Sequence, residues 1–440
     1  MKQTLLTAAV LATLGCMTLM PPAQAAVANS ATNNLAASTK AANSSAAYKT
    51  ATNNTAALSQ LARQIEALPA LSAARANVRA AELNLKAAGN AVYNPELGLG
   101  YQNADTDSYN LSVSQTFDWG DKKQAAQNEA LLMLRRAEAE LELSQSALWA
   151  EALSAMVAQQ QTAAVLGFQT EQRELARAQL RLATERKRAG LISGGELSLI
   201  ELDLAALEAA VSLATQAAIE ADTRLLTLFG TLELPRVDMA ELLAQSPVDI
   251  DEAAISRLPA LERNYQDVQL SRLGADKLRA STSADPTLTL GAEKEGSDNK
   301  LGLNLSIPLK VRNNYSDAIA AATEAGIGAE QQYLASERAL TQAWRQYQYA
   351  QPKLAQSWQS WQMRVKGSAS TLGSSLASQW QAGEISTSDF LQGKRQLAQS
   401  FIAGTELEAR LYQNWLDWVG QSGLLASLMP SGASVEVTTP

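Results

Sequence analysis

The chain contains 440 residues, of which 46% are hydrophobic and only 5% aromatic, and its formal net charge is −8. This acidic balance, without a large basic patch, argues against a nucleic-acid partner. The sequence contains no His, which excludes a His-based metal site, catalytic triad or general base. Alanine dominates the apolar residues, a composition typical of long and closely packed helices.

Residues 1–25 have the pattern of a secretory signal peptide. Lys2 gives a positive start, an apolar run extends from Leu5 to Leu19, and Ala23-Gln24-Ala25 forms a small-residue cleavage site. Leu14-Gly15-Cys16 resembles a lipidation sequence, although Thr13 stands where such a sequence has an aliphatic residue. Two interpretations stay open: cleavage after Ala25, which leaves a mature chain without Cys and without disulfides, or lipidation at Cys16.

The two ends of the remaining chain are expected to be simple. Residues 26–56 are biased to Ala, Asn, Ser and Thr, which predicts a flexible N-terminal arm. Residues 426–440 are expected to form a C-terminal tail. No stretch after residue 25 contains about 20 uncharged apolar residues, so no transmembrane helix is predicted. An exported chain of this kind is either soluble or enters a membrane by other means.

The sequence between these ends is duplicated. LPALSAARANVRAAELNLKAA at 68 matches LPALERNYQDVQLSRLGADKL at 258. Four pairs of residues keep a nearly constant offset of 190 to 193: Pro69 with Pro259, Pro95 with Pro286, Ser114 with Ser306, and Gly190 with Gly383. Shared Ala and Leu content alone would not align prolines and glycines in this way. The chain therefore divides into repeats at 57–229 and 253–425, joined by a polar connection at 230–252 with two prolines.

Each repeat has the pattern of helix, hairpin, long helix, turn and helix. The first helix is expected at about 71–91. The segment 122–188 has no Pro and only one Gly, and 67 residues of helix would extend for about 100 Å. Its partner at 316–381 is interrupted by residues that favour kinks, namely Gly326, Gly328, Pro352, Gly367 and Gly373. Helices this long indicate a coiled-coil or tubular assembly.

The hairpins are predicted at 95–118 and 286–310, where apolar residues alternate with small or polar ones. The turns are expected at 104–108 and at Gly296–Asn299. The apolar positions that define one face are Leu97, Leu99, Leu111, Val113, Leu288, Leu290, Leu303 and Leu305. The small and polar positions, such as Gly98, Ser112 and Asn304, define the other.

Two interpretations of these hairpins compete. In one, the apolar face packs on a soluble core. In the other, it meets lipid, because transmembrane barrel strands have this alternation over about 9 to 11 residues, with aromatic residues near the interfaces. Tyr101, Tyr109, Phe117 and Trp119 would supply the aromatic residues. A barrel must close, and three chains of four strands would give twelve strands and a channel. The membrane interpretation therefore predicts a trimer.

Over residues 57–425 the chain resembles the TolC-like outer-membrane efflux proteins, the exit ducts of tripartite export pumps. The resemblance rests on the duplication and on the Gly turns at 190 and 383. It also rests on four motifs: NPELGLG at 94, DPTLTLG at 285, FDWGDKKQAAQNEA at 117 and IPLKVRNNYSDAIAAATEA at 307. IPLKVRNNYSDAI is most similar to the branch that serves heavy-metal cation pumps.

The resemblance implies a mainly α fold with a small β part. Three chains would form one duct, with four β-strands per chain in a shared 12-stranded transmembrane barrel and a long periplasmic α-helical barrel. The duct would lie in the outer membrane of a Gram-negative bacterium. It would give a passive exit path for metal cations or drugs delivered by an inner-membrane pump and a periplasmic adaptor protein. No cofactor is implied.

The turns between the long helices also admit two interpretations. In the simple one, Gly190 and Gly383 end helices, and Glu196 and Asp389 favour the dipoles of the helices that follow. The resemblance instead implies the periplasmic tip. It assigns an adaptor contact to Gly190, Leu191, Gly383 and Glu384, and a gate to Glu196 and Asp389. Trp380, three residues before Gly383, is a further candidate for the gate. A packing role for Trp380 is an equal alternative.

A ring of three carboxylates at a constriction would favour cations. The chain departs from the best-known members of the family at two positions. Ile385 and Gln392 stand where those members have Arg and Asp. The polar lock of this gate, if one exists, must therefore be built differently.

An enzyme is not expected, because no catalytic motif, phosphate-binding Gly loop or cluster of metal ligands occurs. Two alternatives to the efflux duct stay open. One is a periplasmic or surface coiled-coil interaction protein whose hairpins pack on its own helices. The other is the exit duct of a protein secretion system.

Overall fold

The computed structural model describes residues 54–103, 105–245, 250–365 and 369–430. The predicted signal peptide, Cys16, most of the predicted arm and the last ten residues lie outside this part. The described residues form two compact units. The turn-bearing unit comprises Leu166–Ala214 and Met363–Phe401. The strand-bearing unit comprises the described residues within Ala51–Val165, Thr215–Gln362 and Ile402–Pro440.

The elements of the first repeat confirm the predicted order. They are α2 (Asn54–Glu66), α3 (Pro69–Ala88), β1 (Glu96–Gln102), β2 (Ser108–Thr116), α4 (Lys122–Arg188) and α5 (Gly194–Phe229). The bounds of α4 are those predicted from the absence of Pro. The described residues of the predicted arm, 54–56, are helical and belong to α2. The Asn54 side-chain amide donates to the Asp238 carbonyl at 3.1 Å and accepts from the Asp238 amide at 3.0 Å, which ties this residue to the segment before α6.

The second repeat contains its helices and its hairpin in the same order. After α6 (Met239–Gln245) and the 3-10 helix η1 (Glu252–Arg257), it contains α7 (Pro259–Ser281), β3 (Thr287–Glu295), β4 (Asp298–Ser306), α8 (Ser316–Val365), α9 (Ala369–Ala382), α10 (Thr387–Ser422) and α11 (Leu425–Leu428). Gly326, Gly328 and Pro352 all lie inside the continuous helix α8. Gly367, the next residue predicted to kink this helix, lies outside the described residues.

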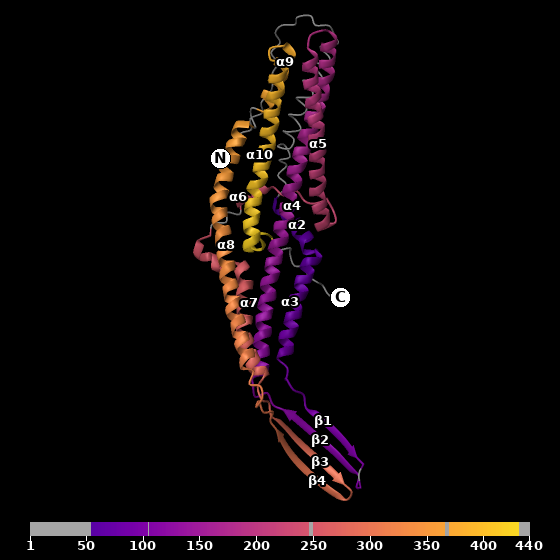
Figure 1. Cartoon of the computed structure of the whole chain (residues 1–440), viewed down its shortest axis with the longest axis vertical. Helices are drawn as coiled ribbons and strands as arrows, with labels where there is room; N and C mark the ends of the chain where they lie inside the picture. Colours follow the sequence, from indigo (N-terminus) through magenta and orange to yellow (C-terminus); the bar gives the residue numbers. More distant parts are fainter. Residues whose placement is uncertain (1–53, 104, 246–249, 366–368, 431–440) are drawn as a thin grey trace. The chain divides into compact units, whose positions relative to one another are not determined.

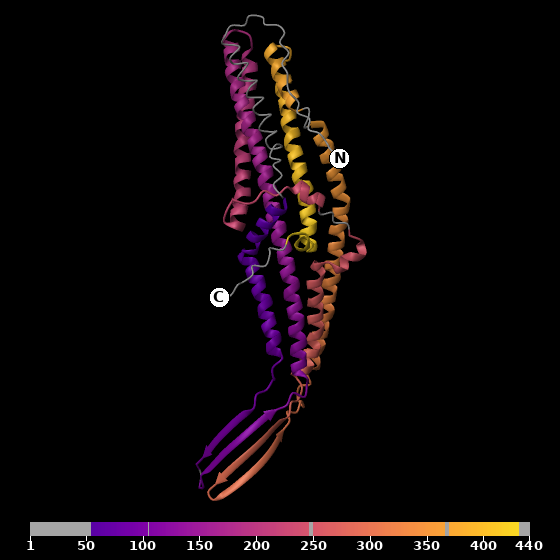
Figure 2. The same cartoon turned by 180° about the vertical axis from the view of Figure 1, so that it is seen from behind.

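The four strands form one antiparallel sheet in the order β1-β2-β3-β4, which Figure 1 and Figure 2 show from opposite sides. Leu99 pairs with Leu111, Val113 with Leu290, and Leu288 with Leu305. Paired residues in an antiparallel sheet point to the same side. All eight predicted apolar positions therefore share one face. The predicted four-residue turn at 296–299 is wrong in length. Glu295 pairs with Asp298, so that only Gly296 and Ser297 turn the chain, with Gly296 at φ 57°.

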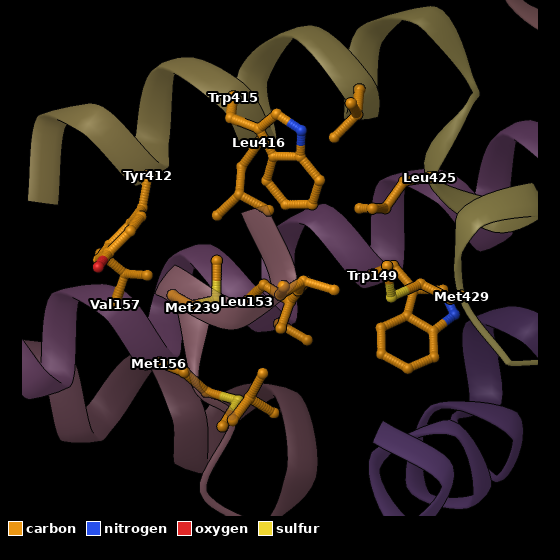
Figure 3. Close-up of a cluster of buried hydrophobic side chains, with 14 of the residues drawn as sticks. Trp149, Leu153, Met156, Val157, Met239, Tyr412, Trp415, Leu416, Leu425 and Met429 are labelled. Carbon is orange, nitrogen blue, oxygen red and sulfur yellow. The ribbon is translucent and has the colours of Figure 1, made fainter. Parts of the chain in front are cut away.

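The core of the strand-bearing unit joins residues that are far apart in the sequence. Figure 3 shows Leu153 of α4, Met239 of α6 and Leu416 of α10 in one buried cluster. The expectation of a purely polar connection at 230–252 is wrong, because Val237, Met239 and Leu242 are buried there. The predicted tail also begins within the fold, since Met429 belongs to the same cluster.

Candidate membrane surface and interhelical turns

The apolar face of the sheet is exposed. All eight of its predicted residues are exposed to solvent, as are Tyr101, Tyr109 and Leu301 on the same face. A contiguous apolar surface of this kind on a folded chain marks an interaction with lipid or with protein. The exposure does not fit the alternative in which the hairpins pack on the chain's own helices. Among the described residues, no helix combines the length and apolar character needed to cross a membrane.

Aromatic side chains flank the apolar face. Tyr101 and Tyr109 pair across β1 and β2 near the hairpin turn, with ring centroids 5.2 Å apart. Phe117 and Trp119 are exposed beyond the other end of β2. Phenol and indole rings prefer the boundary between hydrocarbon and water because they are apolar with one polar group. The arrangement therefore matches the two aromatic levels predicted for a membrane-crossing sheet.

The opposite face carries small and polar residues. Gly98 lies opposite Ser112, and a Cβ atom on Gly98 would lie only 2.5 Å from the Ser112 Oγ. Glycine at this position therefore leaves room for a hydroxyl on the same face. Asn110, Thr289 and Asn304 add further hydrogen-bonding groups. This face suits contact with water and differs clearly from the leucine-rich face.

One buried carboxylate joins the chain segments at the base of the sheet. Asp285 accepts hydrogen bonds from Tyr93 at 2.6 Å, Ser283 at 2.9 Å and the Trp119 amide at 3.2 Å, and Lys122 lies 2.7 Å from it. Burial alone would raise the pKa of Asp285. The hydrogen bonds from Lys122, Tyr93, Ser283 and Trp119 outweigh burial and lower this pKa to about 2. The carboxylate is therefore charged at neutral pH.

Both interhelical turns have the same backbone geometry. Gly190 and Gly383 have φ of 74° and 76°, the left-handed conformation that favours glycine after a helix. The Leu191 amide donates to the Arg186 carbonyl at 2.8 Å, and the Glu384 amide donates to the Gln379 carbonyl at 2.9 Å. The simple interpretation of these glycines as helix ends is confirmed. Leu191 and Glu384 are both exposed.

The two predicted gate carboxylates lie in the first turns of the helices that follow the interhelical turns. Glu196 accepts from the Ser193 amide at 2.8 Å, and the Glu196 amide donates to the Ser193 Oγ at 3.1 Å, which is a complete capping box. Hydrogen bonds from Ser193, first from its amide, lower the pKa of Glu196. Ser386 donates to Asp389 at 2.7 Å, and the Asp389 amide donates back at 3.1 Å. Ser193 and Ser386 supply the capping hydroxyls, and the predicted interaction of the two acids with the helix dipoles fits their positions.

Trp380 is buried between the two turns. Its ring stacks on Phe390, with centroids 4.9 Å apart, and the Arg186 guanidinium lies over it at 5.2 Å. The indole Nε1 donates to the Thr387 Oγ1 at 3.2 Å, and Thr387 donates to Glu196 at 3.2 Å. The geometry favours the packing role for Trp380, while its part in a gate stays a prediction. Arg186 and Thr387 were not predicted, because neither carries a motif of its own.

A second polar contact joins three helices of the turn-bearing unit. The Lys394 ammonium on α10 lies 3.0 Å from the Gln179 Oε1 on α4 and 3.4 Å from Asp203 on α5. Burial lowers the pKa of Lys394, and Asp203 opposes this effect. The described residues contain no group of three or more acidic, Cys or His side chains placed to hold a metal ion. The contacts of Lys394 link α4, α5 and α10.

The fold matches solved structures of outer-membrane channels. The outer membrane channel CmeC of Campylobacter jejuni aligns with a TM-score of 0.70 at 13% identity, over 87% of this chain and 87% of that chain. The chain has the TolC-like fold. The outer membrane protein VceC of Vibrio cholerae gives a TM-score of 0.68 at 16% identity, over 84% of this chain and 96% of that one. The open-state MtrE outer membrane channel of Neisseria gonorrhoeae gives 0.60 at 13% identity, over 84% and 89%.

No protein-family model matches the chain, and no curated protein sequence matches it either. The TolC-like fold is thus recognised through the structure at low sequence identity. The fold explains why a helical chain carries two hairpins with an exposed apolar face. Each repeat contains one interhelical turn, and this equivalence accounts for the shared geometry of the two turns.

Proposed function

We propose that the protein is the outer-membrane channel of a tripartite efflux pump in a Gram-negative bacterium. The observation that carries this proposal is the four-stranded sheet, which exposes a leucine-rich face and in which, among the described residues, the edge strands β1 and β4 each pair on one side only. An open sheet edge is not tolerated in lipid, because unpaired backbone groups have no water there. Closure with further copies of the chain resolves this, and three copies give twelve strands.

In the trimer the two faces of the sheet have different roles. The leucines face lipid, and the glycines, serines and asparagines line water. The long helices continue the path as a tunnel on the periplasmic side. Transport through this path is passive, since the chain has no catalytic motif, and the energy comes from an inner-membrane pump. Metal cations and drugs are the substrate classes proposed for this duct, and the pump rather than the duct selects among them.

The two interhelical turns form the periplasmic end of the duct in this proposal. Their exposed residues, Leu191 and Glu384, and the open space beside Gly190 and Gly383 suit contact with a periplasmic adaptor protein. Asp389 is exposed and Glu196 is half-buried, and both lie near the turns. Three copies of each would place a ring of negative charge at the entrance, which favours cations.

Fractionation and conductance test the proposal together. The full-length protein, expressed with its own leader, is expected in the outer membrane, as a trimer in mild detergent, and to give ion-conducting channels in a planar bilayer. A soluble monomer that needs no detergent would contradict the proposal and favour the alternative of a coiled-coil interaction protein. Co-purification with a protein secretion apparatus instead of an efflux adaptor would replace the efflux role with secretion.

A further inference from the structure

The two hairpins of the sheet have the same strand register. Adding 191 to a β1 residue and 192 to its β2 partner gives a pair observed between β3 and β4. Glu96 with Ser114 becomes Thr287 with Ser306, and Gly100 with Asn110 becomes Gly291 with Gly302. The rule holds along the whole of β1, because Gln102 with Ser108 becomes Glu293 with Lys300. The hairpins are therefore equivalent pair by pair, and the sequence duplication extends to hydrogen-bond register.

The junction between the hairpins has its own register. The strands β2 and β3 pair Ser112 with Gly291 and Val113 with Leu290. At this junction a Cβ on Gly291 would lie 3.7 Å from the Ser112 Cβ, so a glycine accommodates the polar side chain opposite it. The junction is thus a specific fit between the second strand of one hairpin and the first strand of the next.

The outer strands expose the surface that such a junction would cover. β1 is equivalent to β3, and β4 is equivalent to β2. The edge leucines are more exposed than their interior equivalents in every comparison: Leu97 67% against Leu288 37%, Leu99 77% against Leu290 61%, Leu303 72% against Leu111 49%, and Leu305 61% against Val113 49%. Pairing of both edges with neighbouring strands would remove this difference.

We propose that β4 of one chain pairs with β1 of a second copy in the register of the β2–β3 junction. The two offsets place Asn304 opposite Gly100 of the second copy, Leu303 opposite Tyr101, and Gly302 opposite Gln102. Apolar residues then face apolar ones along the new junction, and Gly100 again accommodates the larger polar side chain of Asn304. The contact is head-to-tail and builds a ring. This inference rests on the proposed trimeric channel and adds its intermolecular register.

Engineered cysteine pairs test the register, because the only Cys of the chain is Cys16 in the predicted leader. Two double variants are in register: Asn304→Cys with Gly100→Cys, and Gly302→Cys with Gln102→Cys. Two are shifted by two residues: Asn304→Cys with Gln102→Cys, and Gly302→Cys with Gly100→Cys. All four sites lie on the polar face. At both glycines a Cβ has no contact closer than 3.5 Å, so the substitutions fit.

Only contacts between chains can form these disulfides. Within one chain β1 and β4 are separated by three strand spacings, about 14 Å, whereas a disulfide needs Cα atoms within about 7 Å. Directly opposed residues satisfy this limit, and diagonal ones at about 7–8 Å do not. Oxidation in outer-membrane vesicles followed by non-reducing electrophoresis should link both in-register variants into dimers and trimers. The shifted variants should lose these bands.

The result separates this inference from the proposed function. Cross-linking of the shifted variants in place of the in-register ones, or equally with them, overturns the register. A membrane-embedded trimer in which none of the four variants cross-links also overturns it, while the channel proposal stands. A monomer that does not cross-link overturns both.

Discussion

At the residue scale, Asp285 connects several segments of the chain. Its carboxylate is the common acceptor for groups from three segments: Tyr93 before β1, Trp119 and Lys122 after β2, and Ser283 before β3. Charge-assisted hydrogen bonds to a buried carboxylate are stronger than those between neutral groups. This residue therefore links the base of the sheet to the start of α4.

The substitution Asp285→Ala is expected to lower the free energy of unfolding by about 1–3 kcal/mol, because it leaves buried donors without their acceptor. Asp276→Ala is the matched control. Asp276 pairs with Arg279 on α7 at 2.5 Å, and both side chains are exposed, so its loss should cost at most about 1 kcal/mol. Denaturant unfolding in detergent, followed by tryptophan fluorescence, measures both. Equal effects of the two substitutions would contradict the structural role of Asp285.

Acid should remove the contribution of Asp285 in a defined window. Its pKa is about 2 in the folded chain and 3.8 as an ordinary value. A lowered pKa means that the unfolded chain binds the proton more readily, so the stabilisation is complete above about pH 4 and is lost as the pH falls towards 2. The difference in unfolding free energy between wild type and Asp285→Ala should shrink over this range. A difference that is constant from pH 5 to 2 would contradict the assignment.

At the element scale, the sheet differs from the sheet of a soluble protein because its apolar face is exposed rather than packed on a core. Its leucines align across all four strands, and the chain's own helices leave them exposed. The neighbouring residues on each strand point to the opposite side. Two adjacent positions on one strand therefore have different expected environments, which gives a matched pair of variants on β4.

Leu303→Arg is expected to impair membrane insertion, because a cationic side chain on the lipid face costs about 2–4 kcal/mol near the middle of a bilayer. Asn304→Arg, one residue further along β4, should insert normally because its side chain faces water. The amount of each variant in the outer-membrane fraction, with total expression as reference, measures the effect. Equal insertion of both variants would reject the assignment of the two faces.

At the scale of the whole molecule, the long helices and the hairpins could be predicted from the sequence. The residues that pack on one another between distant segments could not. The bounds of α4 and the two hairpins follow from local patterns, namely the absence of Pro and the alternation of leucine with small residues. The burial of Val237 and Met239 depends on helices far away in the sequence, so the connection at 230–252 looked polar. Trp380 posed the same difficulty, since Arg186, whose guanidinium lies over its ring, comes from the other repeat.

In the proposed trimer, selectivity at the periplasmic end would be a property of the assembly. Asp389→Asn removes one charge per chain, hence three in a trimer, and retains an oxygen that can accept from Ser386. The ratio of cation to anion permeability in a planar bilayer should fall, because the ring of negative charge is lost. Ser388→Ala, at an exposed neighbouring position on α10, is the control and should leave this ratio unchanged. An unchanged ratio for Asp389→Asn would exclude the predicted role in the gate.

The free edges of β1 and β4 also constrain how the protein reaches its final state. A single chain in lipid would leave both rows of backbone groups without hydrogen bonds, and each unsatisfied group costs several kcal/mol. In the proposed channel, insertion would therefore be coupled to association, and chains that have not yet met their neighbours would remain outside the hydrocarbon. The yield of inserted channel should then rise more steeply than linearly with the rate of synthesis. At a low rate of synthesis, each chain should remain longer in a protease-sensitive form before it meets its neighbours.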